Sequence, residues 1–268
     1  MKARIVSSAQ GARWLIDGWR LFRAAPLGWL AAVFAYWLVM TLVSLVPIAG
    51  IVLASALVPA FSLGFMALAR AASLGARLEL SQLFDGFRNG RKAMLILGAI
   101  YFACLAAVLG ATMLADEGAL ARWMAVGQQP GEEAVRSESF LSALALGSAL
   151  YAPVMMMFWF APPLAAWHSV GPVKSLFFSF FACLMNWRAF LAYGAATALV
   201  TLVLPAVVLT AVLVASGGAL RLPVMGLVFP LLIVMLPTLF ASFYASYRDV
   251  FADAILPRKN ASSIDEPT

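Results

Sequence analysis

The feature that most constrains this chain is a run of 43 residues, Leu27 to Ala69, that contains no charged side chain. A helix rises about 1.5 Å per residue, so about 20 residues cross the hydrocarbon core of a bilayer, which is about 30 Å thick. The run is therefore long enough to cross twice. Because Pro47 and Gly50 supply a turn near its middle, we expect a transmembrane helical hairpin.

The composition of the whole chain agrees with a membrane protein. Hydrophobic residues make up 64% of it and charged residues only 11%, against about 25% charged residues in a soluble domain. We therefore expect an all-α fold: a polytopic transmembrane helical bundle of six spans, arranged as three helical hairpins that each follow an amphipathic interface helix. The spans are predicted at 27–46, 48–69, 93–115, 140–167, 189–215 and 224–247. Residues 1–259 are expected to form a single transmembrane domain, and 260–268 a disordered cytoplasmic tail.

Three segments that precede spans are predicted to be the interface helices. Residues 9–25 place Arg13, Asp17 and Arg20 on one face of a helix, and 80–87 and 177–188 carry apolar residues at helical spacing. Tryptophan rings favour the membrane interface, and arginine guanidinium groups reach toward lipid phosphates. The residues predicted to face lipid headgroups are Arg13, Trp14, Trp19, Arg20, Arg70, Arg88, Trp187, Arg188 and Arg248.

The basic residues also predict the orientation in the membrane. With the N-terminus in the cytoplasm, 15 of the 18 lysines and arginines fall in cytoplasmic segments and 3 fall outside. This bias predicts that both termini are cytoplasmic. The acidic connection 116–138 would then lie outside. Its carboxylates could hold a cation or act in acid–base chemistry, but they lack the spacing of a ligand loop, which favours a solvated exterior loop.

An internal repeat accompanies this plan. Residues 16–20 (IDGWR) resemble 84–88 (FDGFR), and 177–188 keeps the aromatic residues of this pattern without its Asp-Gly. Pro59 and Pro237 are each followed by a phenylalanine six residues on and an arginine eleven residues on. The repeats would be parallel, related by an axis along the membrane normal. A further proline, Pro205, is expected to kink the fifth span.

The opening pattern Gly11-Ala12-Arg13-Trp14, with Gly18-Trp19 and Phe22, and the step Asn186-Trp187-Arg188 resemble a family of proteobacterial integral membrane proteins. This resemblance covers nearly the whole chain, and it implies a six-span inner-membrane protein without assigned chemistry. In the arrangement of its predicted helices alone, the chain is similar to the membrane domain of some bacterial glycerophosphodiester phosphodiesterases. The phosphodiesterase domain has no counterpart here, so its activity does not carry over.

Residues that would carry chemistry are scarce. The central regions of the predicted spans hold no Asp, Glu, Lys or His, which argues against a proton-driven transporter. Cys104 and Cys183 form no metal-binding pattern, and His168 is the single histidine, so we expect no metal and no cofactor. The net charge of +6 follows from topology rather than from nucleic-acid binding.

The sequence therefore favours a non-enzymatic inner-membrane component that interacts with membrane lipids or with an envelope protein. The alternative is a channel or permease for a small or amphipathic solute, not coupled to protons. Hydroxyl groups that converge on a cavity would favour transport, and the groups to place are Ser55, Thr197 and Thr201. A membrane enzyme acting on lipid headgroups would need Asp17, Asp85 or His168 to converge at one cytoplasmic site.

Overall fold

The computed structural model describes residues 2–46, 49–217 and 228–252. Throughout these ranges the regular elements are helices and no strand occurs, which confirms the all-α prediction. The chain divides into two compact units: unit 1 comprises Met1–Arg20 and Met185–Thr268, and unit 2 comprises Leu21–Leu184. The predicted tail 260–268 and the first residues of the predicted sixth span lie outside the described residues.

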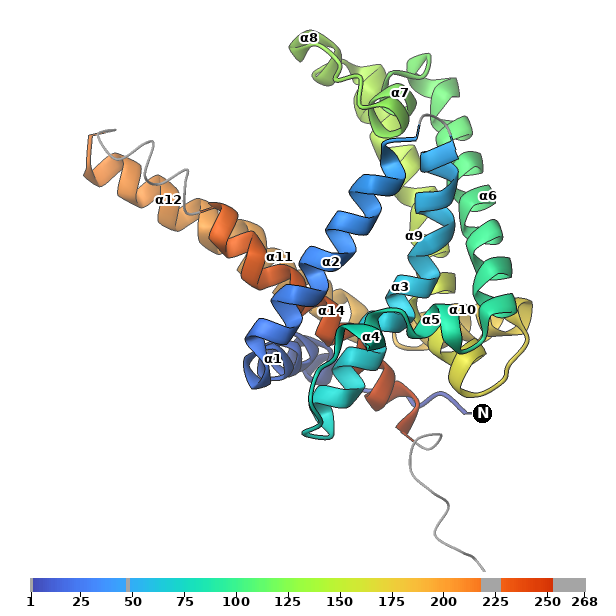
Figure 1. Ribbon diagram of the computed structural model, residues 1–268. Helices are drawn as coiled ribbons and strands as arrows, with labels where there is room; N and C mark the ends of the chain where they lie inside the picture. Colours follow the sequence, from blue (N-terminus) through green and yellow to red (C-terminus); the bar gives the residue numbers. More distant parts are fainter. Residues whose placement is uncertain (1, 47–48, 218–227, 253–268) are drawn as a thin grey trace, which may run out of the picture. The chain divides into compact units, whose positions relative to one another are not determined.

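Unit 2 contains four long apolar helices, shown with their labels in Figure 1. They are α2 (Pro26–Ser44), α3 (Ala49–Ser73), α6 (Arg91–Asp116) and α9 (Glu138–Trp167). Shorter helices connect them: α4 (Leu80–Leu83), α5 (Asp85–Arg88), α7 (Ala119–Val126) and α8 (Glu132–Val135). A further helix, α10 (Pro172–Met185), follows α9. The predicted second interface helix is therefore two short helices.

Unit 1 begins with α1 (Ser8–Ala24), whose last turn belongs to unit 2, and continues with α11 (Trp187–Ala198), α12 (Leu204–Ala215) and α14 (Val228–Val250). A π-helical turn, Leu199–Val203, joins α11 to α12. Proline has no N–H, and its ring clashes with the carbonyl four residues before it. Pro205 thus explains why the α-helical hydrogen-bond pattern changes to the wider π-helical pattern here, at the place where the sequence predicts a kink.

Five helical stretches of the described chain are long and apolar enough to cross a membrane. They are Pro26–Ser44, Ala49–Ser73, Arg91–Asp116, Glu138–Trp167 and Trp187–Ala215. They coincide with the first five predicted spans. The sixth predicted span overlaps α14, whose N-terminus borders residues outside the described ranges. The six-span count and the three-hairpin plan therefore stay predictions.

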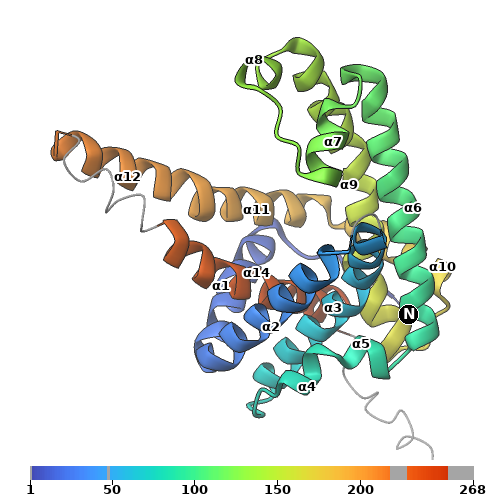
Figure 2. The same cartoon turned by 45° about the horizontal axis from the view of Figure 1, so that its top comes forward.

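The core of unit 2 is built on α6 and α9, which lie side by side (Figure 1), as the turned view in Figure 2 also shows. α3 packs against α6. The buried apolar residues shared among these helices include Ala60, Leu63, Leu97, Tyr101, Val154 and Phe158. The rings of Tyr101 and Phe158 meet edge to face, with centroids 4.9 Å apart.

The Asp-Gly pair shared by residues 16–20 and 84–88 marks the place where the first two predicted interface helices meet proline-containing helices. In unit 2, Gly86 lies against the backbone of Ala60, the residue after Pro59, and a Cβ atom at position 86 would lie 2.7 Å from Ala60 Cα. In unit 1, Gly18 lies against the carbonyl of Thr238, the residue after Pro237. Only glycine permits so close an approach of two backbones.

The third predicted interface helix, 177–188, is divided in the structure between α10 and the first two residues of α11. α10 contacts α9 through a hydroxyl group instead. Ser179 Oγ donates to the Met156 carbonyl oxygen at 2.7 Å and accepts from the Phe160 amide at 2.9 Å. These two backbone groups are one helical turn apart in α9. A side chain that enters the ladder in this way is one of the recognised causes of a bend in a helix.

Candidate functional site

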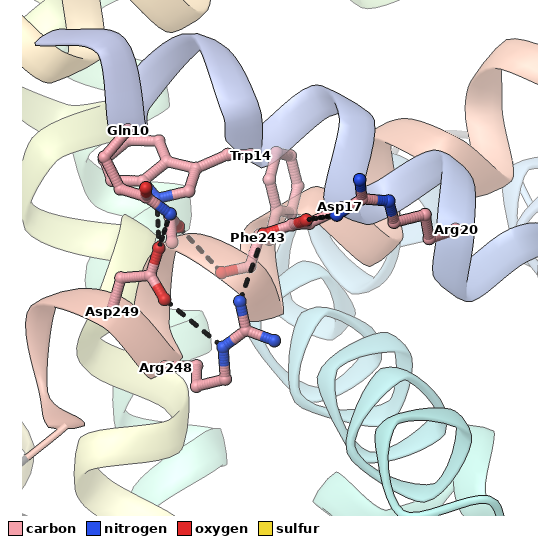
Figure 3. Close-up of polar contacts among 8 residues, drawn as sticks. Gln10, Trp14, Asp17, Arg20, Phe243, Arg248 and Asp249 are labelled. Carbon is pink, nitrogen blue, oxygen red and sulfur yellow. Dashed lines mark hydrogen bonds and ion pairs between the residues drawn. The ribbon is translucent and has the colours of Figure 1, made fainter.

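The described chain has two candidate sites: a cluster of polar side chains in unit 1 and a cavity of ligand size in unit 2. The first lies in unit 1, where charged and amide side chains of α1 meet the end of α14 (Figure 3). Asp249 Oδ2 accepts from Gln10 Nε2 at 2.6 Å and from Trp14 Nε1 at 3.0 Å. Arg248 bridges two carboxylates, with Nε 3.2 Å from Asp249 Oδ1 and NH2 3.1 Å from Asp17 Oδ2. We call these five residues the Asp249 cluster.

The spacing along α1 explains how one helix supplies three of these partners. Gln10, Trp14 and Asp17 follow one another at intervals of four and three residues, so they share one face of the helix. Asp17 is also paired with Arg20 at 3.1 Å, within the same helix. The sequence therefore predicted the charged face correctly, but Asp17 contacts α14 rather than solvent, and its side chain is only 16% exposed.

Trp14 differs most from its prediction as a headgroup-facing ring. Its side chain is 0% exposed, and its ring packs edge to face on Phe190 with centroids 5.2 Å apart. Tyr193 lies on another side of the same ring, and its hydroxyl is 2.6 Å from Ser242 Oγ. Trp14 is thus a core residue that joins α1, α11 and α14, because its buried N–H finds a carboxylate partner.

The extended segment before α1 is fixed by Asn186. The side-chain oxygen of Asn186 accepts from the Val6 amide at 2.8 Å, and its nitrogen donates to the Arg4 carbonyl at 2.9 Å. The Arg4 amide in turn donates to the Val250 carbonyl at 2.8 Å. Backbone groups outside helices need such partners. Asn186 thus fixes the segment before α1 beside the start of α11, and the Arg4 amide ties the same segment to the end of α14.

The electrostatics of the Asp249 cluster favour permanent ion pairing. Burial lowers the pKa of Arg248, but the neighbouring Asp249 and Asp17 carboxylates outweigh that effect and raise it above its usual value. The guanidinium therefore stays charged at every physiological pH. Its donors are directed at two carboxylates, which is the arrangement of a structural clamp between helices.

The second feature is a cavity of about 540 Å³ in unit 2, between α3, α6, α7 and α9. Aliphatic and aromatic side chains line it, and none of its lining residues is charged. Its polar lining consists of the hydroxyl groups of Ser55, Tyr101, Thr112, Ser148 and Tyr151. We call it the α7 cavity. Its volume is in the range of small-molecule sites, which is about 300–1,000 Å³.

One side of the α7 cavity is formed by α7 itself, which Asp116 holds in position. The two carboxylate oxygens of Asp116 accept from the amides of Gly118 at 2.9 Å and Leu120 at 2.7 Å. Gly118 is the N-cap residue of α7 and Leu120 lies in its first turn, where amides have no earlier helical carbonyl to bond. Asp116 is therefore a buried cap, whereas the sequence predicts a solvated carboxylate at this position.

The remaining predicted headgroup residues are mostly exposed. They are Arg13, Trp19, Arg20, Arg70, Arg88, Trp187 and Arg188. Two of the arginines lie over tryptophan rings: Arg188 over Trp187 and Arg70 over Trp167, each with its guanidinium carbon 5.3 Å from the ring centroid. Arg248 differs, because it is clamped in the Asp249 cluster with its side chain 40% exposed.

The enzyme hypothesis requires Asp17, Asp85 or His168, and each of these interacts with neighbours of its own. Asp85 Oδ1 accepts from Asn89 Nδ2 at 2.7 Å. Burial first, and then the positive charge of Arg70, lower the pKa of His168 below its usual 6.5. In the ranges the structure describes, no group of three His, Cys, Asp or Glu side chains could hold a metal ion.

The hydroxyl groups chosen to separate transport from scaffolding divide between two situations. Ser55 lines the α7 cavity, together with Thr112 and Ser148. Thr201, in contrast, donates to the Thr197 carbonyl of its own helix at 2.7 Å. Hydroxyl groups thus gather on a cavity in unit 2, whereas the Thr201 hydroxyl in the π-helical turn bonds to the backbone of its own helix. The Thr197 hydroxyl of α11 interacts with Tyr193 instead.

Sequence comparison identifies a relative of this chain. A probable inner membrane protein of Burkholderia thailandensis is 40% identical to this chain over 252 residues, which cover 92% of each of the two chains. The chain belongs to the same family. It is therefore an integral membrane protein of an inner-membrane family, as its apolar helices and its resemblance to proteobacterial membrane proteins predict. No family model matches the sequence, and no solved structure matches it.

Proposed function

We propose that this inner-membrane protein is a non-enzymatic component that binds membrane lipids, with anionic headgroups held at its cytoplasmic ends. The observation that carries the proposal is the pairing of arginine with tryptophan at the ends of apolar helices. Arg188 and Trp187 begin α11, and Trp187 is 51% exposed. Arg70 lies in the last turn of α3, over Trp167 at the end of α9.

Each member of such a pair favours the interfacial region for its own reason. An indole ring is most stable at the level of the headgroups, and a guanidinium forms bidentate hydrogen bonds with phosphate oxygens. The stacked ring also holds the guanidinium in place before a lipid arrives, which lowers the entropy lost on binding. Both pairs fall in segments that the distribution of basic residues assigns to the cytoplasm.

Lipid identification after extraction in native-membrane nanodiscs tests the proposal. We expect anionic phospholipids to be enriched around the wild-type protein, and Arg188→Gln to reduce that enrichment by about fivefold, which corresponds to about 1 kcal/mol per arginine at an anionic surface. Arg136→Gln is the matched control, since Arg136 is exposed but lies in the predicted exterior connection. Equal enrichment in wild type and in Arg188→Gln would refute the proposal.

The orientation belongs to the same proposal and has its own measurement. Both termini are expected in the cytoplasm, together with Arg70 and Arg188. Single cysteines placed at exposed positions 88 and 136, in a chain without Cys104 and Cys183, should react differently with a membrane-impermeant maleimide on intact spheroplasts. We expect labelling at 136 and protection at 88. The opposite pattern would invert the topology.

A permease for an amphipathic solute is the second candidate, because hydroxyl groups line the α7 cavity. Flux through proteoliposomes distinguishes the two. Transport of lipids or amphipathic solutes that Ser55→Ala abolishes would favour the permease. Retention of lipid without any flux would favour the binding component.

A further inference from the structure

We infer that the α7 cavity is a binding site for one acyl chain of a membrane phospholipid. The inference deepens the proposed function, since it names a second part of the lipid that the protein recognises. It concerns hydrocarbon rather than headgroup, and it uses residues of α3, α6, α7 and α9 that the arginine–tryptophan pairs do not include.

The chemistry of the walls selects an apolar occupant. The cavity carries no charged side chain, so an ionised ligand would lose its hydration without gaining an ion pair. Most of its hydroxyl groups already have partners: Tyr101 and Tyr151 lie 2.9 Å apart, and Thr112 donates to the Leu109 carbonyl at 2.8 Å. Hydrocarbon gains dispersion contacts with such walls and forfeits no hydrogen bond.

The length of the cavity matches the length of a lipid acyl chain in one leaflet of the bilayer. Its wall on α6 extends from Tyr101 to Thr112, which at about 1.5 Å per residue is about 16 Å along the helix. The hydrocarbon core is about 30 Å thick, so one leaflet contributes about half of it. An acyl chain that lies parallel to α6 therefore spans the cavity while its headgroup stays at the membrane surface.

Access and closure are also visible in the structure. Ile51 of α3 and Leu144 of α9 line the cavity and are exposed, to 39% and 46%, so the cavity opens toward the surroundings of these two apolar helices. In a membrane those surroundings are lipid, and a chain can enter sideways without crossing water. α7, capped by Asp116, covers one side of the cavity.

A pair of neighbouring alanines on α6 offers a matched test. Both are exposed, but Ala106 lines the cavity and Ala107 does not. Purified protein is delipidated and titrated with zwitterionic phosphatidylethanolamine, and retained lipid is counted by native mass spectrometry. We expect one tightly bound lipid in the wild type, affinity about tenfold weaker or worse in Ala106→Phe, and unchanged affinity in Ala107→Phe.

Several results would overturn the inference. These are the absence of a tightly bound lipid in the wild type, wild-type affinity in Ala106→Phe, or an equal loss in both variants, which would indicate general surface packing. Size-exclusion profiles and melting temperatures establish that the variants fold. If Ala106→Phe does not, Ser148→Phe replaces it with Ala149→Phe as its control, because Ser148 lines the cavity and Ala149 does not.

Two further arms separate this site from its alternatives. A short apolar probe, 1-octanol, should compete with phosphatidylethanolamine only at high concentration, and binding of octanol by protein that retains no phospholipid would overturn the inference. Arg188→Gln should leave the zwitterionic lipid in place. Loss of anionic enrichment and loss of cavity binding are thus independent results, so either proposal can fail alone.

Discussion

Substitution of Gly18 by alanine tests the central packing contact of unit 1. Gly18 of α1 lies against α14, in contact with the Thr238 carbonyl oxygen. A Cβ atom added at position 18 would lie 2.9 Å from Ser242 Cβ and closer still to that oxygen, whereas ordinary contacts begin near 3.4 Å. The two helices would therefore separate by at least 0.5 Å, because a backbone carbonyl has no alternative rotamer.

The expected cost follows from that displacement. A gap of about 0.5 Å already forfeits about a quarter of the dispersion well of each facing atom pair, and overpacking of this kind costs about 1–3 kcal/mol. The Arg248–Asp17 contact, now 3.1 Å, would lengthen toward the limit of a hydrogen bond. Alanine recovers about 0.5–1 kcal/mol of helix propensity. We expect a net loss of about 1–2 kcal/mol.

Gly194→Ala is the matched control, since Gly194 lies in α11 and a Cβ there would meet nothing within 4 Å. It should stabilise the protein by about 0.5–1 kcal/mol, so the two substitutions are expected to have opposite signs. Thermal unfolding in one detergent, followed by tryptophan fluorescence, measures both, and buried Trp14 reports on the same interface. If Gly18→Ala is as stable as Gly194→Ala, the close approach of α1 and α14 does not exist.

Three other substitutions test the remaining polar contacts. Asp249→Asn turns an amide donor toward donors of the cluster and should cost about 1–3 kcal/mol, with a red shift of Trp14 emission that wild type does not show. Asn186→Ala releases the backbone of residues 4–6 and should speed proteolysis or hydrogen exchange there, while leaving the melting temperature of unit 2 unchanged. The unfolded chain protonates His168 more readily than the folded chain, whose pKa is lowered, so stability should fall as pH drops below about 6.5. In His168→Gln this part of the pH dependence should vanish, and an unchanged profile between pH 5 and 7.5 would exclude the histidine as its source.

The helices could be predicted from sequence because lipid imposes a length on them. Stretches without charge, such as 27–69 and 93–115, specify helices that must bond their own backbone. The structure begins and ends α2, α3 and α6 within a few residues of the predicted limits. The sequence predicts a kink at Pro205, but not that a π-helical turn would form there. The hydrogen-bond register of a helix depends on local steric crowding, which composition does not encode.

The polar contacts were harder to predict, because they join residues far apart in the sequence. Trp14 and Asp249 are separated by 235 positions, and no local pattern indicates that they meet. The spacing of Gln10, Trp14 and Asp17 was a usable signal: three hydrogen-bonding side chains on one face of α1 favour a partner over solvent. Asp116 was misjudged for a similar reason, since its partners are backbone amides that any residue supplies.

Packing in lipid also explains why a cavity can persist beside a tightly packed helix pair. Lipid tails are as apolar as leucine, so helices gain little from burying apolar surface and associate chiefly where small residues let their backbones approach. On α6 such a contact exists at Gly98, which lies against the backbone of Ala56 of α3. The wall of the α7 cavity begins three residues later, at Tyr101. In water that space would be under pressure to collapse, whereas in a bilayer hydrocarbon fills it at little cost, and selection can then shape its walls around an acyl chain.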